Sequence, residues 1–230
     1  MTRKRTILAT LLAMGVAAGL SAGEKKAAKG NLAPLPLKLP IPAFMGTPPD
    51  MELGPHVEPP RDTPRPPFLA PKGVVNLAFK KKVTSSDKSP ITGTLDMVTD
   101  GNKEATDDSF VELHRRTQWV QIDLGCKAKI YAVLIWHDHS TYQVYHDVIV
   151  QVADDPDFTK NVRTLFNNDY DNSSGLGIGR QKEYFENYEG KLIDAKGVEA
   201  RYIRCYSRGS TYSALNRYTE VEVWGKCVGK

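Results

Sequence analysis

Residues 119–136 read WVQIDLGCKAKIYAVLIW, and this stretch decides the fold. In its first half, Val120, Ile122 and Leu124 alternate with Trp119 and polar residues. Successive side chains of a β-strand point to opposite faces, so this alternation is typical of a half-buried strand. The second half, residues 130–136, is apolar throughout, which indicates a strand that is covered on both sides. The stretch therefore predicts β-structure with one segment buried on both faces.

The same alternation recurs further along the chain. Val148, Val150 and Val152 fall on one face of a predicted strand, and in residues 219–224 two valines lie opposite two glutamates. Glycine, asparagine and aspartate cluster between these runs, and we find no long segment with a period of 3.6 residues. Eighteen of the twenty aromatic residues follow residue 72. Residues 73–228 are therefore predicted to form an all-β domain, an antiparallel sandwich or jelly roll.

The first 23 residues have the pattern of a secretory signal peptide. Three basic residues at positions 3–5 precede an apolar run over residues 7–20, and small residues close it at Ser21, Ala22 and Gly23. Cleavage is expected after Ala22 or Gly23, which predicts a secreted or periplasmic protein with no membrane span after cleavage. An uncleaved anchor is the alternative, although the run is short for a span of about 20 residues.

Residues 24–72 are rich in proline. Thirteen of the fifteen prolines lie between Pro34 and Pro71. Proline fixes φ and lacks the amide donor, so this segment is predicted to be an extended, disordered linker without helix or central strand. A docking ligand for a protein partner is the alternative interpretation.

The distribution of charge and the number of cysteines limit the possible partners and disulfides of the chain. Residues 1–72 carry ten Lys and Arg against five Asp and Glu, whereas residues 73–230 carry 21 against 22. A nearly neutral domain has no cationic surface for phosphate backbones, so no nucleic-acid partner is expected. Of the three cysteines, Cys205 alternates with core positions, and Cys126 and Cys227 could form a disulfide, which the sequence alone does not establish.

Six short segments, in order, carry a resemblance to a known family. They are Asn-Leu-Ala at 76–78, Val-Thr-Ser-Ser at 83–86, Thr-Asp-Gly at 99–101, WVQIDLG at 119–125, ARYIR at 200–204 and EVEVWG at 220–225. This series resembles the discoidin or coagulation factor type C domain, a galactose-binding-like jelly roll. The resemblance implies an eight-stranded β-sandwich whose loops at one end bind glycans, or in some members phospholipid or protein, without catalysis. The stretches at 137–147 and 166–175 depart from the common pattern and indicate a divergent, bacterial-type member.

The resemblance also implies a structural calcium ion between the Asp-Gly loop and the last strand. Oxygen ligands of this kind and number suit Ca²⁺. The family's threonine lies five residues after the aspartate, where this chain has Ala105 instead, so the corresponding Thr106 departs from the pattern. An Asp-Gly turn beside a surface glutamate is the alternative. The implied ligand residues are Met97, Asp100, Asn102, Thr106, Thr219 and Glu220.

Residues 136–147, WHDHSTYQVYHD, hold three of the five histidines. If this connection is extended, His137 and His139 point the same way, and His146 could complete a three-nitrogen metal site. Polar loop residues that bond the backbone are another interpretation. Sugar contact is a third, because imidazoles and the rings of Tyr142 and Tyr145 bond hydroxyls and present flat apolar faces.

Two further loops contain candidate ligand-binding residues. The loop at 169–175 offers Asp169, Asp171, Asn172 and Ser173, either for a second cation or for sugar hydroxyls, and a solvated turn-rich loop is the alternative. The segment at 207–217 offers planar hydrogen-bonding groups and a ring. Its candidates are Arg208, Tyr212 and Asn216.

The predicted function is a secreted, non-catalytic module that binds a polysaccharide or other glycan and carries a structural calcium. One alternative is an extracellular adhesion or scaffold protein that uses the same face to bind a protein partner. Another is a metal-dependent hydrolase that uses His137, Asp138, His139 and Asp169. The sequence contains neither Gly-x-Ser-x-Gly nor His-Glu-x-x-His, so neither of these two catalytic motifs supports an enzyme.

Overall fold

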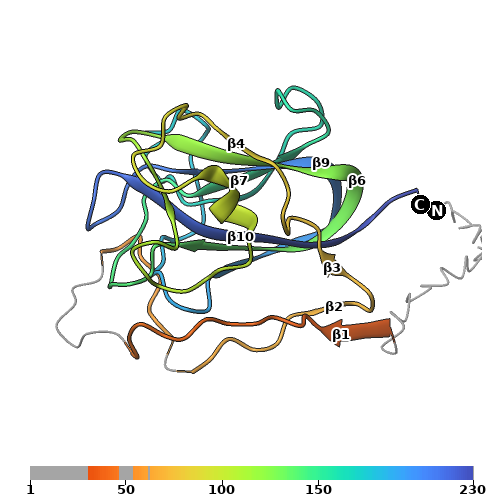
Figure 1. The fold of residues 1–230 in the computed structure, drawn as a ribbon, viewed down its shortest axis with the longest axis horizontal. Coiled ribbons are helices and arrows are strands. Elements are labelled where there is room, and N and C mark those ends of the chain that lie inside the picture. Colours follow the sequence, from red (N-terminus) through yellow and green to blue (C-terminus); the bar gives the residue numbers. More distant parts are fainter. Residues whose placement is uncertain (1–30, 47–53, 62, 230) are drawn as a thin grey trace, which may run out of the picture. The chain divides into compact units, whose positions relative to one another are not determined.

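The structure of the chain is a computed structural model that describes residues 31–46, 54–61 and 63–229. The predicted signal peptide lies outside the described residues. No helix among the described residues is long and apolar enough to cross a membrane. The strands are β1 (Leu32–Pro34), β2 (Leu69–Pro71), β3 (Val75–Asn76), β4 (Val83–Ser85), β5 (Val111–Leu113), β6 (Gln118–His137), β7 (Ile149–Ala153), β8 (Arg163–Asn167), β9 (Lys191–Ser207) and β10 (Asn216–Cys227) (Figure 1). A short 3₁₀ helix, η2 (Leu95–Thr99), precedes β5.

Strands β3 to β10 form one antiparallel, eight-stranded network that folds into two layers. Its order is β3-β10-β6-β9-β7-β8, with β4 added to β6 and β5 added to β10. The start of β6 pairs with β4 and the end of β9, whereas its later part pairs with β10 and the start of β9. The register of β6 and β9 shifts between Asp123 and Ala128, where both strands pass from one layer to the other. The predicted all-β antiparallel sandwich is confirmed.

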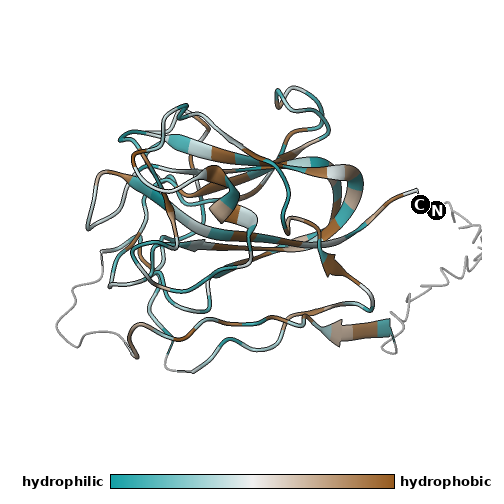
Figure 2. Ribbon diagram, viewed as in Figure 1, coloured by the Kyte–Doolittle hydropathy of each residue, from teal (hydrophilic) through white to brown (hydrophobic). Residues whose placement is uncertain are grey.

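The core lies between the layers and follows the predicted alternation. Val120, Ile122 and Leu124 are at most 1% exposed, and the three valines of 148–152 are fully buried. Teal and brown segments alternate along β6 in Figure 2. The sequence pattern and the burial of these side chains therefore agree residue by residue.

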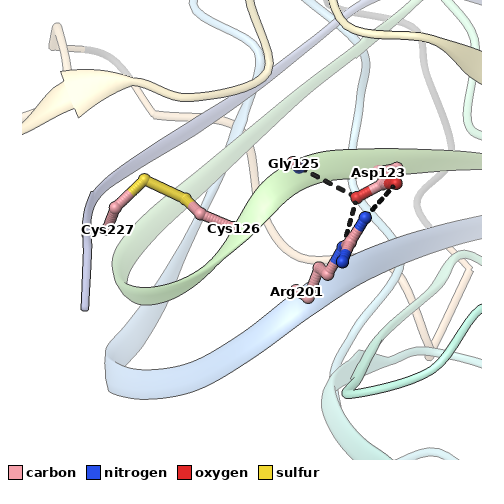
Figure 3. The surroundings of a disulfide bond; sticks show 5 residues. All are labelled: Asp123, Gly125, Cys126, Arg201 and Cys227. Carbon is pink, nitrogen blue, oxygen red and sulfur yellow. Dashed lines mark hydrogen bonds and ion pairs between the residues drawn. A yellow bond between two sulfur atoms is a disulfide. The ribbon is translucent and has the colours of Figure 1, made fainter. Parts of the chain in front are cut away.

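A disulfide closes the bend of β6 onto the end of β10. Cys126 and Cys227 are bonded, with their Cα atoms 5.8 Å apart (Figure 3). Beside it, Arg201 donates to both carboxylate oxygens of Asp123, at 2.9 and 3.0 Å. Cys205 is buried in the core, as predicted, and burial raises the pKa of its thiol to about 12. This thiol is thus an inert core group.

The proline-rich segment differs from the prediction of a disordered linker. β1 and β2 pair with each other, and Leu35 and Ala70 are buried against the outer face of the sheet. That face presents Ala132, Leu134 and Trp136 of β6 together with Trp224 of β10, and these form a second apolar cluster with the segment. The described part of residues 31–72, called the arm below, is therefore a third layer. It supplies the second cover that the apolar run at 130–136 requires.

The arm is fixed to the turn that precedes β9. Arg65 donates through its backbone amide to Glu189 Oε1 at 2.7 Å and through its guanidinium to the carbonyls of Gly190 and Glu189, at 2.7 and 2.9 Å. A hydrogen bond from Trp136 Nε1 to the carbonyl of Tyr188 fixes this turn to β6. A proline-rich extended chain forms no hydrogen bonds within itself. Its order therefore depends on contacts with the rest of the domain, such as those of Arg65.

Candidate functional site

The loops at one end of the sandwich form a polar depression of about 280 Å³, called the cup below. It lies where β8 and β9 end and β7 begins, since Ile149 pairs with both Asn167 and Tyr206. Antiparallel pairing thus brings three loops to one place. The residues that line the cup are His146, Asp147, Tyr170, Asp171, Ser173, Glu183 and Arg208.

A histidine–glutamate pair forms one side of the cup. His146 Nδ1 lies 2.7 Å from Glu183 Oε1, and the glutamate is 6% exposed. The hydrogen bond with Glu183 raises the pKa of His146, and burial lowers it by a smaller amount. The imidazole side chain remains 40% exposed, so it can bond both the protein and a ligand.

Acidic and basic groups converge on the floor of the cup. Asp147 is 5% exposed, and its Oδ2 accepts a 2.6 Å hydrogen bond from Ser173 Oγ. Arg208 Nη1 lies 3.7 Å from the same oxygen. Burial raises the pKa of Asp147, and the nearby charges of Asp169 and Asp171 raise it further. The floor therefore combines hydrogen-bond donors and acceptors in a partly desolvated position.

The loop after β8 is held open by its own side chains. Both carboxylate oxygens of Asp169 accept backbone amides, from Ser173 and Ser174, at 3.0 Å each. Asn172 lies at φ 59° and accepts the amide of Gly177 at 2.7 Å. Asp169 is fully buried. Asp169 and Asn172, which the sequence put among the ligand contacts, therefore shape the loop instead.

Three carboxylates of the cup region could hold a hard cation. Oxygens of Asp147, Asp169 and Asp171 all lie within 4.8 Å of one another. Carboxylate oxygens suit Ca²⁺, but the oxygens of Asp169 already accept amides of the loop. The interpretation of this loop as a second cation site stays a prediction.

The histidine-rich stretch does not form a metal centre. His137 is fully buried, its Nδ1 lies 2.7 Å from Glu186 Oε1, and Tyr145 stacks on its ring at 4.3 Å. His139 is 1% exposed, and its Nε2 lies 2.9 Å from the carbonyl of Lys103. The three imidazoles form no metal-ligating group in the part of the chain that the structure describes. The expectation that His137, His139 and Tyr145 contact a ligand is wrong, because all three side chains are buried, at most 1% exposed.

Three other predicted contacts lie outside the cup. Tyr142 packs against Phe44 of the arm, with ring centroids 3.9 Å apart, and Tyr212 is 68% exposed. Asn216 is fully buried and bonds four backbone or side-chain groups: Ser207, Gly209, His114 and Arg116. Asn216 is thus a structural residue that orders the loop before β10. Of the predicted ligand contacts, the cup contains His146, Asp171, Ser173 and Arg208.

The sequence missed three residues of the cup: Asp147, Tyr170 and Glu183. The first two lie inside loops that were singled out, so their positions could have suggested them. Glu183 has no local signal, because it reaches the cup only through the long-range pairing of its loop.

The predicted calcium residues are only partly brought together. Glu220 is fully buried; its Oε2 accepts the amide of Gly101 at 3.0 Å, next to Asp100. Its other oxygen, Oε1, is buried without a hydrogen-bond partner. Burial raises the pKa of Glu220 to about 9. Thr219 is buried beside it.

The remaining predicted ligands bond within their own turns. Thr106 Oγ1 donates to Asp108 at 2.7 Å and also contacts the Ser109 hydroxyl. Asn102 bonds Asp100, Ser109 and Glu104, and the amide of Met97 donates to Thr94. The unpartnered oxygen of Glu220 suits a cation, whereas the hydroxyl of Thr106 is already bonded to Asp108 and Ser109.

Comparison with known proteins gives similarity at the level of fold. No protein-family model matches the chain, and a search of curated proteins gives no match. Among solved structures, a family 32 carbohydrate-binding module from Clostridium perfringens, in complex with GlcNAc-α-1,4-galactose, is 16% identical over 67% of this chain and 96% of that chain, with a TM-score of 0.49. The chain is similar in fold to carbohydrate-binding modules. A fucose-binding module of Streptococcus pneumoniae is 18% identical over 65% of this chain and 96% of its own, with a TM-score of 0.46.

The comparison with solved structures also finds part of a larger enzyme. The chain is 19% identical to a family 89 glycoside hydrolase of Clostridium perfringens over 68% of its own length, with a TM-score of 0.49. It spans only 15% of the length of that hydrolase.

Proposed function

We propose that this chain is a secreted, non-catalytic module that binds carbohydrate in the cup. One observation carries the proposal: planar hydrogen-bonding groups surround an exposed ring in a shallow depression. The imidazole of His146, the guanidinium of Arg208 and the carboxylate of Asp171 suit hydroxyl groups, and Tyr170, 48% exposed, offers an apolar ring. A shallow site buries little of a ligand, so we expect weak affinity for one sugar unit.

A glycan array tests this function. We expect the wild-type protein to bind a subset of glycans, and Arg208→Ala to lose that binding because the cup loses its cationic donor. Arg163→Ala is the matched control, because Arg163 is an exposed arginine at the opposite end of β8. Unchanged glycan binding in Arg208→Ala would show that the ligand binds at a site other than the cup. A blank array together with a captured protein would favour the adhesion alternative.

The absence of catalysis is part of the proposal and has its own test. Asp147 and Asp171 lie close together with their pKa values shifted in opposite directions, upward by burial at Asp147 and downward by hydrogen bonds from Ser173 at Asp171. Carboxylate pairs also serve glycosidases. We expect no release of reducing sugar from any glycan that the array identifies. Release that is lost in Asp147→Asn would make the chain an enzyme.

We further propose a structural calcium ion at Glu220, held with the carboxylate of Asp100 and nearby carbonyls. The support is the buried, unpartnered Oε1 of Glu220 beside the Asp-Gly loop. A buried carboxyl oxygen without a partner is costly, and Ca²⁺ would satisfy it. The array is therefore run with and without Ca²⁺.

A further inference from the structure

The arm reaches the cup as well as the outer face of the sheet. Residues 56–58 pair with Glu183: the amide of Glu58 donates to the Glu183 carbonyl at 2.8 Å, and the amide of Glu183 donates to the His56 carbonyl at 2.9 Å. Glu183 is the residue that bonds His146 inside the cup. The backbone of the arm thus fixes a residue that lines the cup.

A second contact from the arm supports the ring of the cup. The imidazole of His56 stacks on Tyr170, with ring centroids 4.0 Å apart and an angle of 6° between the planes. Both rings are exposed, so without His56 the ring of Tyr170 would have one more face in water. Glu58 also pairs with Lys191 at 2.8 Å, which ties the same segment to the start of β9.

We propose that the arm is a working part of the cup: residues 56–58 position Glu183 and Tyr170, and ligand affinity depends on their docking. This inference rests on the proposed function for its ligand. The imidazole of His56 and the backbone amide of Glu58 are positioning groups, because they act on the ligand through Tyr170, Glu183 and His146. The loss of one backbone hydrogen bond, worth about 1 kcal/mol, predicts about five-fold weaker binding.

Two substitutions at one position isolate the backbone contact. Glu58→Pro removes the amide that donates to Glu183, whereas Glu58→Ala keeps the amide and removes only the pair with Lys191. We expect Glu58→Pro to weaken binding of the best glycan from the array, measured by calorimetry, and Glu58→Ala to stay within about two-fold. Tighter binding in Glu58→Pro would make the arm a competitor for the cup, and unchanged binding would make it irrelevant; either result overturns the inference.

A measurement without ligand separates this inference from the proposed function. The imidazole of His146 faces Glu183, Asp147 and Arg208, and the bond with Glu183 raises its pKa. NMR titration of His146 should therefore give a lower pKa in Glu58→Pro than in the wild type and in Glu58→Ala. If no glycan binds the wild-type protein, the proposed function fails, and an unchanged titration then overturns the arm's role independently. If Glu58→Pro fails to fold, His56→Ala takes its place with the binding measurement alone, because it removes the ring that stacks on Tyr170 and keeps the backbone bonds to Glu183. Unchanged binding in His56→Ala would then overturn the inference.

Discussion

At the scale of single residues, Arg217 joins two carboxylates near the loop end. Its Nε lies 2.6 Å from Glu112 Oε1, and its Nη1 lies 2.8 Å from Asp138 Oδ2. Burial raises the pKa of Asp138, but hydrogen bonds from Ser140 and Arg217 outweigh it, and the pKa lies below its usual range. Asp138, which the sequence offered to a hydrolase, is therefore a structural anion.

Removal of this guanidinium should destabilise the fold. Arg217→Ala leaves Glu112 and Asp138, 7% and 2% exposed, without their cation, and we expect a loss of about 3 kcal/mol in the free energy of unfolding. Urea denaturation measures it. Arg217→Lys, which keeps the charge but not the forked geometry, should lose less. A loss below about 1 kcal/mol in Arg217→Ala would show that water replaces the arginine.

Glu220 gives a pH-dependent prediction. With a pKa of about 9 in the calcium-free fold, Glu220 binds a proton that the unfolded chain, with a carboxyl pKa of about 4, releases. Its contribution to stability is therefore present below pH ~4 and is lost as pH rises toward about 9. In chelator, the melting temperature of the wild type should fall across this window, and the slope should be smaller in Glu220→Gln.

Calcium should reverse that trend, because it binds the ionised carboxylate. Addition of Ca²⁺ at the alkaline end of the window should raise the melting temperature of the wild type and leave Glu220→Gln unchanged. If the melting curves of the wild type with and without Ca²⁺ coincide, the proposed calcium site is wrong.

At the scale of elements, the anchoring of the arm depends on one of its arginines more than on the other. Arg65 makes three hydrogen bonds to Glu189 and Gly190, whereas Arg61 adds one ion pair to Glu189 and has a side chain that is 46% exposed. Arg65→Ala should lower the free energy of unfolding by about 2 kcal/mol, and Arg61→Ala by less than about 1 kcal/mol. Calorimetric melting compares them, and equal losses would contradict the assignment of Arg65 as the main anchor.

The strands could be predicted from the sequence because their signal is local. The alternation of apolar and polar residues at 119–124 and 148–152 involves neighbouring residues only. A shift of the strand register by one residue would expose the whole apolar face to solvent. The order of the arm could not be predicted in this way. Several of its contacts join residues more than 120 positions apart, as between Arg65 and Glu189, and its composition is shared with free linkers. The one hint was the apolar run at 130–136, which needed a second cover.

The candidate site was predictable only to the level of loops. Residues 137, 139 and 145 looked like polar loop or ligand positions, yet β6 includes His137, and Glu186 bonds Nδ1 of that imidazole from 49 residues away. Burial of a histidine depends on such distant partners. For Arg208 and Asp171, position in a loop was enough to predict that they belong to the candidate site, because their side chains stay at the surface.

At the scale of the whole molecule, the arm should be required for a stable fold. A variant that begins at residue 73 removes Leu35 and Ala70, and with them the cover of Leu134 and Trp136, which are fully buried in the intact chain. Exposure of a large apolar side chain costs about 2 kcal/mol, so these two together predict a loss of ~4 kcal/mol in the free energy of unfolding.

The uncovered face should also associate, because contiguous apolar surface favours contact between copies. We expect the shortened variant to bind a hydrophobic dye and to elute early in size-exclusion chromatography. A variant that begins at residue 31 keeps every arm contact described above and is the matched control. If the variant from residue 73 melts at the same temperature as this control and remains monomeric, the arm is not required for the stability of the sandwich. Cover by the arm would then not explain why residues 130–136 are all apolar. The expected difference would instead make the arm a layer of the domain, and the boundary of the folded unit would move from residue 73 to the start of β1.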